Sequence, residues 1–599
     1  MKEQVSRGRW FVSSFLINLA AIIIAAFLFA AAFPNLLFAN GLPLLAWVAY
    51  IPVFWVLRRV GIGASFFWGA VYGYAAYGIF NYWLSVFHPL AGLIVGSIYL
   101  VYLAFLFPLL RLALLLFPRR GYILQFLLWM AFEYLRTLGF LGYSYGITGY
   151  SQWHLLPIIQ IADIAGVWGV SALVVFPSVW LGAALGETGT RDWGTGIREW
   201  GSSAVRESNK SDLQTKTPVP VPQSLVPSPC FLLPTLHDSW LNIRNFFRRE
   251  WIPALVWFVL LVVSLVYGFA SRIDYSGARE VKLALIQHNT DPWAPDKAPT
   301  VAEAFEEYRN DFNILTRLSD EALAAHPDTD FVVWSETAFV PRIYWHINYR
   351  DDPVSWELVK ELLDYLARQD VPFVIGNDDA RKDPSINPYD DNRVDYNAVM
   401  LFERGKLITQ YRKLHLVPFT EHFPYEKQLP WIYQALKNAD THFWETGTEA
   451  TVFESRGVKF STPICFEDTF GNLSRDFVRN GAELIVNLSN DAWSRSLPAQ
   501  MQHLSMAVFR AVENRRSMVR STASGQTCAI DPNGKILAMA EPFTQAWLSV
   551  KVPVVTPHTL YTRYGDYLGV FFSWAAFLLL ILGAGSHIIR KMPRNDKRH

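Results

Sequence analysis

Ser461-Thr462-Pro463-Ile464-Cys465-Phe466-Glu467-Asp468 is the most informative stretch of this 599-residue chain. It places one cysteine at the end of an apolar run, with two carboxylates directly behind it. Free cysteine is among the most buried residue types, so Cys465 is interpreted either as a packing residue or as a nucleophile. A cysteine nucleophile needs a base to form the thiolate and a cation or N–H donor to stabilise an oxyanion.

Two upstream residues meet these needs. Glu336 follows the strand-like run Phe331–Trp334, and Lys413 follows a second such run, Leu407–Tyr411. Either residue alone would be an ordinary solvated charge at a strand end. Because ligands gather at the carboxyl ends of strands in α/β sheets, we expect Glu336, Lys413 and Cys465 to form one active site.

Short β-rich runs alternate with helical patterns through residues 272–560, which is typical of an α/β domain. The expected strands are Val281–Gln287, Phe331–Trp334, Val371–Gly376, Ala398–Phe402, Val458–Ile464, Leu484–Leu488 and Met518–Thr522. The expected helices between them include Thr300–Ala325, Val354–Gln369 and Ala499–Glu513.

The composition of the chain points to a membrane protein. Hydrophobic residues make up 52% of it and charged residues only 18%, whereas soluble chains carry about 25% charged residues. The net charge of +1 gives no global basic field, so nucleic acid is not an expected partner. Three cysteines do not form a disulfide framework.

Apolar runs predict about eight membrane spans, each of roughly 20 residues, the length that crosses a bilayer as a helix. They lie near residues 11–33, 36–57, 64–87, 91–117, 122–141, 161–186, 252–270 and 568–588. The first is too long for a signal peptide, so we expect it to be retained. The predicted domains are six spans in 1–186, a cytoplasmic Pro-rich insertion in 187–250, a seventh span in 251–271, the α/β domain in 272–560, an eighth span in 566–589 and a basic cytoplasmic tail in 590–599.

Lys and Arg residues fall on one side of this eight-span arrangement, which predicts the orientation. They precede the first span, follow the second, fourth and eighth, and crowd the insertion between the sixth and seventh. Both termini are therefore expected in the cytoplasm, with the α/β domain on the opposite, periplasmic side. The aromatic stretch Tyr143–Trp153 is expected to be a lipid-facing loop beneath the active site.

Taken together, three motifs resemble the nitrilase superfamily, whose members carry a Glu-Lys-Cys triad on an α-β-β-α sandwich. The motifs are Trp334-Ser335-Glu336-Thr337-Ala338, Tyr411-Arg412-Lys413-Leu414-His415-Leu416-Val417-Pro418-Phe419-Thr420-Glu421 and Ile464-Cys465-Phe466-Glu467, with Asn487-Leu488-Ser489-Asn490-Asp491-Ala492-Trp493 trailing them. The fold class implied by the resemblance is an α-helical membrane bundle plus this α/β sandwich.

The chain as a whole resembles the apolipoprotein N-acyltransferase family of the bacterial inner membrane. Further matches are Ile286-Gln287-His288-Asn289-Thr290-Asp291-Pro292-Trp293, Glu133-Tyr134-Leu135-Arg136 and Gly149-Tyr150-Ser151-Gln152. One departure is Phe466, where a tyrosine is expected after the nucleophile, so a hydroxyl is lost there. The long Pro-rich insertion is a second departure.

The resemblance implies ping-pong acyl transfer. Glu336 would take the proton of Cys465, whose thiolate would attack an acyl ester of a membrane phospholipid. Lys413 and the backbone N–H of Phe466 would stabilise the oxyanion. The N-terminal amine of a diacylglyceryl-apolipoprotein would then attack the thioester and form an amide.

The resemblance also implies supporting residues around the triad. Glu421 and Glu467 would hold Lys413, although each also fits a plain surface carboxylate, and Asn397 matches a family position that supports the site. Trp293 and Trp493 would line the path of the acyl chain or headgroup, with interface anchoring or core packing as the other interpretation. No cofactor and no metal site are expected, because metal-ligand spacing and Gly-rich nucleotide motifs do not occur. A monomer is expected.

Two other functions fit part of the sequence. A membrane-tethered nitrilase-type amidase that hydrolyses C–N bonds would need only one anchoring span. A transporter with an appended binding domain would show discontinuous spans and internal repeats, and it would leave the three motifs unexplained.

Overall fold

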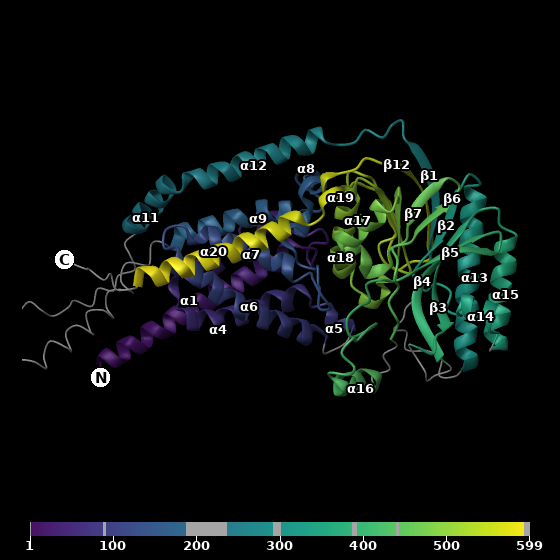
Figure 1. Cartoon of the computed structure of the whole chain (residues 1–599), viewed down its shortest axis with the longest axis horizontal. Coiled ribbons are helices and arrows are strands. Elements are labelled where there is room, and N and C mark those ends of the chain that lie inside the picture. The colour runs from purple at the N-terminus through teal and green to yellow at the C-terminus, as the bar shows by residue number, and fades with distance from the viewer. Residues whose placement is uncertain are drawn as a thin grey trace, which may run out of the picture.

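The computed structural model describes residues 2–87, 91–186, 236–290, 301–350, 352–385, 392–438 and 443–591. A helical bundle forms one end of the elongated molecule, and two sheets with their covering helices form the other (Figure 1). Helix α1 begins and helix α20 ends at the same end of the bundle, away from the sheets (Figure 1). Most of the predicted insertion, residues 187–235, and all but the start of the predicted basic tail lie outside the described residues.

The bundle contains helices that precede the sheet domain in the sequence and one helix that follows it. They are α1 (Lys2–Ala32), α2 (Pro43–Ala46), α3 (Ile51–Arg59), α4 (Ile62–Phe80), α5 (Leu84–Phe87), α6 (Ala91–Leu116), α7 (Gly121–Leu135), η1 (Thr148–Gln152), α8 (Leu156–Ile159), α9 (Ala162–Gly186), α11 (Leu236–Arg249), α12 (Trp251–Ala270) and α20 (Tyr567–Lys591). Glycines let the helices approach closely. A Cβ at Gly69 or Gly73 of α4 would lie 2.2 Å from a backbone oxygen of α6, as expected where small residues pack membrane helices.

Five helices in the described part of the chain are long and apolar enough to cross a membrane: Val12–Ala32 within α1, and α6, α9, α12 and α20. Helix α7 is apolar but only 15 residues long. Helix α12 is the least buried of the five, with 11% of its most apolar stretch buried inside the protein, and it stands apart along one side of the bundle (Figure 1).

The prediction of one span at 36–57 is wrong. The chain there forms two short helices, α2 and α3, which a turn at residues 47–50 separates. Pro43 and Pro52 each lie in the first turn of one of these helices. Proline is accepted in a first turn but removes a hydrogen bond from a helix interior, so the two prolines split the apolar run.

Two six-stranded sheets form the other half, with strand orders β12-β1-β2-β3-β4-β5 and β11-β10-β9-β8-β7-β6. In the first, β1, β2 and β3 are parallel and the outer strands antiparallel; in the second, β7, β8 and β9 are parallel. The strands are β1 (Arg279–Gln287), β2 (Phe331–Trp334), β3 (Phe373–Lys382), β4 (Arg393–Glu403), β5 (Lys406–Arg412), β6 (Val452–Ser455), β7 (Val458–Ser461), β8 (Leu484–Ser489), β9 (Ser517–Thr522), β10 (Cys528–Ile530), β11 (Ile536–Met539) and β12 (Ala546–Val554).

Helices cover the outer face of each sheet, so the layers run α-β-β-α, as the resemblance to the nitrilase superfamily implies. Of the helices in this half, α13 (Val301–Ala325) and α15 (Pro353–Ala367) cover the first sheet and α18 (Leu497–Asn514) packs on the second. The other helices are α14 (Ile343–Asn348), α16 (Pro430–Asn438), α17 (Gly471–Arg479) and α19 (Leu560–Tyr564). One core lies between the sheets and includes Leu285, Val333, Val486 and Val519. A second lies between the first sheet and the pair α13 and α15.

Helix α18 joins the sheet domain to the bundle. All but its first residue are buried, and its apolar side chains share one core with the bundle helices. Trp83 of the bundle donates to the Oε1 of Gln502 at 3.1 Å, and Arg510 donates to the hydroxyl of Tyr150 at 3.0 Å. Just beyond the helix, Arg515 forms an ion pair with Asp163 at 2.6 Å.

We expect Arg515→Met to lower the free energy of unfolding by about 3–5 kcal/mol, because it leaves the carboxylate of Asp163 buried without its cation. Arg404→Met is the matched control: Arg404 also has a positive φ, but its partner Asp370 is exposed. The change there should stay within about 0.5 kcal/mol. Thermal unfolding of the detergent-solubilised protein measures both variants. Equal losses of stability would contradict the view that the Arg515–Asp163 pair holds the sheet domain to the bundle.

Candidate active site

Cys465 lies where the second sheet ends. Beyond β7, Ile464 forms a last bridge to Leu488, and Cys465 then begins the 3₁₀ turn η4 (Cys465–Thr469). Cys465 has φ +49°, which is uncommon for a residue with a side chain and typical of functional sites. The side chain of Asn487 donates to the carbonyl of Cys465 at 3.3 Å and helps to fix this turn.

Glu336 follows β2 and is 7% exposed. Its Oε1 accepts from the side chain of Asn397 at 2.8 Å, and its Oε2 accepts from the backbone N–H of Asn490 at 2.9 Å. The carboxylate is therefore fixed from β4 on one side and from the end of β8 on the other.

Lys413 follows β5 and is fully buried. Its Nζ lies 2.8 Å from Glu421 and 3.5 Å from Glu336. Burial alone would lower the pKa of Lys413, but the two carboxylates outweigh it and hold the pKa above its usual value. The residue is thus a fixed cation, which suits it to stabilise an oxyanion and not to act as a base.

Glu467 ties the cysteine turn to the lysine loop. Its carboxylate accepts from the backbone N–H groups of Ile464, Leu414 and His415 at 2.8, 2.7 and 3.0 Å, and from the hydroxyl of Tyr411. These donors favour the ionised carboxylate and lower the pKa of Glu467. Burial has the larger effect and raises the pKa to about 7.

The surroundings of Cys465 favour the protonated thiol. Burial raises its pKa well above the ordinary value, the charge of Glu336 raises it further, and Lys413 lowers it. A base must therefore remove the proton during reaction, and Glu336 is the carboxylate whose charge acts most strongly on the thiol.

The three remaining predicted site residues, Phe466, Trp493 and Trp293, have three different outcomes. Phe466 is buried, with its ring against Phe470 at a centroid distance of 4.9 Å. Trp493 lies on the turn η5 (Asp491–Ser494) with 39% of its surface exposed. Trp293 lies outside the described residues.

The prediction of a lipid-facing loop at Tyr143–Trp153 is wrong. Tyr145, Tyr150 and Trp153 are each less than 9% exposed, because α18 covers this stretch through contacts such as that of Arg510 with Tyr150. A different bundle residue, Phe140, makes an apolar contact with the lysine loop. The centroid of its ring lies 5.4 Å from that of Phe419.

Sequence reasoning missed a buried group of charges behind the cysteine turn, made by Asp468, Asp491, His503 and Arg520. Arg520 lies in a strand that is otherwise free of charge, and His503 lies in a helix that is buried almost throughout. Charged residues in such apolar settings are rare unless they are paired, which is the signal that could have found them.

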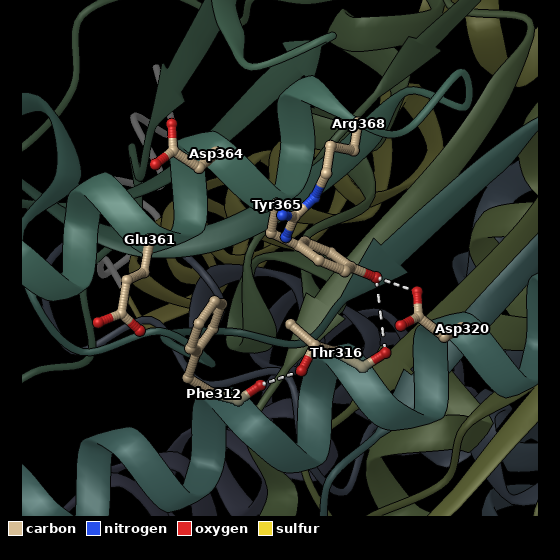
Figure 2. A pocket seen from close by; sticks show the side chains of 7 residues that line it. All are labelled: Phe312, Thr316, Asp320, Glu361, Asp364, Tyr365 and Arg368. Atoms are coloured by element: carbon tan, nitrogen blue, oxygen red, sulfur yellow. Dashed lines mark hydrogen bonds between the residues drawn. The ribbon is translucent and has the colours of Figure 1, made fainter.

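A groove of about 330 Å³ between α13 and α15 is separate from this site. Phe312, Thr316, Asp320, Glu361, Asp364, Tyr365 and Arg368 line it. Tyr365 closes one end by donating to Asp320 at 2.8 Å (Figure 2). The groove lies in the outer helix layer, and none of the triad residues line it. Within the described residues, no group of three or more His, Cys, Asp or Glu is arranged to hold a metal ion.

The α-β-β-α sandwich with Glu, Lys and Cys at neighbouring strand ends defines a nitrilase-like domain, here joined to a membrane bundle. The carbon-nitrogen hydrolase family model matches residues 282–556, and that of the apolipoprotein N-acyltransferase N-terminal domain matches residues 25–180.

Relatives match along nearly the whole chain. Apolipoprotein N-acyltransferase 1 of Treponema denticola is 42% identical, covering 97% of this chain and 98% of that protein. The protein of the same name in Treponema pallidum is 44% identical over 95% of this chain and 96% of its own length. Apolipoprotein N-acyltransferase of Geobacter metallireducens is 32% identical over 92% of both. This chain belongs to the apolipoprotein N-acyltransferase family.

We expect Glu336→Gln to shift the alkylation of Cys465 by iodoacetamide to lower pH, because the carboxylate that raises the thiol pKa is gone. The same variant should lose acylation by phospholipid, by about 10²–10⁴-fold, the usual contribution of a general base. Mass spectrometry of the Cys465 peptide measures the alkylation. An unchanged or higher alkylation pH would contradict this electrostatic account.

Replacing Glu467 by Gln should cost about 1–3 kcal/mol of unfolding free energy, because an amide nitrogen cannot accept and leaves a buried N–H unsatisfied. The exposed Glu454, replaced in the same way, is the control. Thermal melts compare the two, and a Glu467→Gln protein as stable as the control would show that the carboxylate does not fix the loops.

Proposed function

We propose that this chain is a phospholipid-dependent apolipoprotein N-acyltransferase that carries the acyl group as a thioester on Cys465. The observation that carries the proposal is the meeting of a half-buried thiol from the second sheet with a fixed carboxylate and a buried cation from the first. The near-full-length similarity to apolipoprotein N-acyltransferases supports the choice of reaction.

The first half-reaction forms the thioester. Glu336 takes the proton of Cys465, and the thiolate sulfur attacks the carbonyl carbon of a phospholipid acyl ester. The ammonium of Lys413, with the backbone N–H of Phe466, stabilises the oxyanion. The C–O bond then breaks, and Glu336 returns the proton to the leaving oxygen of the lysophospholipid.

The second half-reaction forms an amide. The N-terminal amine of a diacylglyceryl-apolipoprotein attacks the thioester carbon, and Glu336 takes a proton from that amine. The C–S bond breaks and the proton returns to the thiolate of Cys465. A thioester keeps the acyl group activated while one lipid leaves and the next arrives.

We propose that the sheet domain lies on the periplasmic side of the bacterial inner membrane, with both termini in the cytoplasm. The placement of the start of α1 and the end of α20 at the bundle end away from the sheets supports this orientation (Figure 1). The apolar contact of Phe140 with Phe419 favours an acyl donor that enters from the bilayer. We expect the monomer to be the working unit.

The reaction is tested in liposomes with a phospholipid labelled in its acyl chain and a synthetic diacylated lipopeptide. We expect label to reach the lipopeptide amine, lysophospholipid to be released, and initial rates to follow ping-pong kinetics. Label released only as free fatty acid would contradict acyl transfer and indicate a hydrolase.

Removal of the cation should nearly abolish the reaction. Lys413→Met is expected to lower the rate by about 10²–10³-fold, the usual effect of losing one oxyanion donor. Lys459→Met is the control, because Lys459 is half exposed and its ammonium lies 3.8 Å from the exposed carboxylate of Glu454. Retention of full activity by Lys413→Met would contradict the assigned role.

A further inference from the structure

Four buried charges lie directly behind the nucleophile. His503 of α18 contacts Asp468 through Nε2 at 2.6 Å and Asp491 through Nδ1 at 2.9 Å. Arg520 of β9 donates to Asp468 and, at 3.1 Å, to Asp491. All four side chains are at least 92% buried, so each charge relies on the others.

The two aspartates belong to the two turns that carry the reaction. Asp468 lies in η4, three residues after Cys465. Asp491 follows Asn490, whose backbone N–H binds Glu336 at 2.9 Å. Both cations therefore bridge the turn of the nucleophile to the turn that holds the carboxylate.

Both ring nitrogens of His503 face carboxylates, and the doubly protonated ring can donate to both of them. Arg520 also lies 3.3 Å from Nδ1. Burial would lower the pKa of His503, but Asp468 and Asp491 raise it to about 9 against the opposing charge of Arg520. The group then holds two positive and two negative charges.

We propose that Asp468, Asp491, His503 and Arg520 form a charge clamp that fixes Cys465 and Glu336 relative to each other, with His503 and Arg520 as positioning residues. This inference rests on the proposed acyl transfer for its effect on rate, but its structural claim does not. The neighbouring Gln502 on α18 donates to the carbonyl of Pro34 at 2.9 Å, so the helix that carries the clamp is also fixed to the bundle.

The clamp predicts a distinctive dependence of stability on pH. The folded pKa of His503, about 9, lies above its ordinary value of 6.5. The stabilisation is therefore complete below pH 6.5 and is lost as the pH rises through about 9. The other groups facing this cluster are Cys465, Cys528 of β10 and, from the bundle, the ring of Tyr145 at 6.3 Å.

The test compares the full-length protein with His503→Gln, and with His326→Gln as the control. His326 lies outside the active site, beside Lys282 at the far end of the sheets. Thermal midpoints are measured at several pH values between 6 and 10, and acylation of Cys465 by labelled phospholipid is measured in single turnovers. Alkylation of Cys465 by iodoacetamide gives a third measurement that needs no lipid.

We expect His503→Gln to acylate roughly 10- to 100-fold more slowly, at an unchanged phospholipid KM, because misplaced groups lower the rate by such factors. Its alkylation should move to higher pH, since the clamp behind the cysteine turn loses a positive charge. The gap in thermal midpoint from the wild type should be wide near pH 6.5 and narrow as the pH passes about 9. His326→Gln should match the wild type in all three.

A pH-independent gap in thermal midpoint, or wild-type acylation by His503→Gln, would overturn the proposal. If that variant does not fold, Asp468→Asn, which keeps the side-chain shape and removes one carboxylate of the clamp, must slow acylation and show the pH-dependent gap in thermal midpoint at smaller size. Its alkylation should instead move to lower pH, because a negative charge is lost. Failure of wild-type protein to acylate would count against the proposed function alone, because the midpoints and alkylation still report on the clamp.

Discussion

A fully buried ammonium is the constraint on which this site depends. Removing the charge of Lys413 from water costs several kcal/mol unless carboxylates compensate, and Glu421 and Glu336 do so at 2.8 and 3.5 Å. Those carboxylates need donors of their own. The backbone N–H of Val417 supplies one to Glu421, and Asn397 supplies one to Glu336. The backbone N–H of Asn490 supplies a second donor to Glu336 at 2.9 Å, so the strand ends of the first sheet meet the end of β8 around the buried lysine.

The membrane bundle also contributes to the geometry of the active site. Helix α18 packs on the second sheet with one side and on the bundle with the other, and it carries His503 behind the cysteine turn. The same helix reaches Tyr150 and, just past its end, Asp163 of the bundle. The geometry of the thiol is thus tied to the helices that lie among lipids, which suits an enzyme whose substrates are both held in the membrane.

Much of this arrangement could be predicted from the sequence, because the triad motifs and the alternating strands are local patterns. The predicted strand Phe331–Trp334 and helix Ala499–Glu513 agree with β2 and α18. Two kinds of feature could not be predicted. The division of the apolar run 36–57 into two helices depends on Pro43 and Pro52 occupying first turns. The hydrophobicity of the run does not show which turn of a helix each proline occupies. The contacts of His503 join residues from four separate elements, and no spacing within one segment reveals such long-range pairs.

The central claim is that Cys465 itself carries the acyl group taken from a phospholipid. Incubation of the protein with liposomes of one defined phospholipid, without an acceptor, followed by proteolysis and tandem mass spectrometry, locates any added acyl chain. The account predicts one acyl mass on the peptide that contains Cys465, removed by neutral hydroxylamine and absent from Cys465→Ala. An unmodified Cys465 peptide, or the acyl mass on another residue in both proteins, would contradict it.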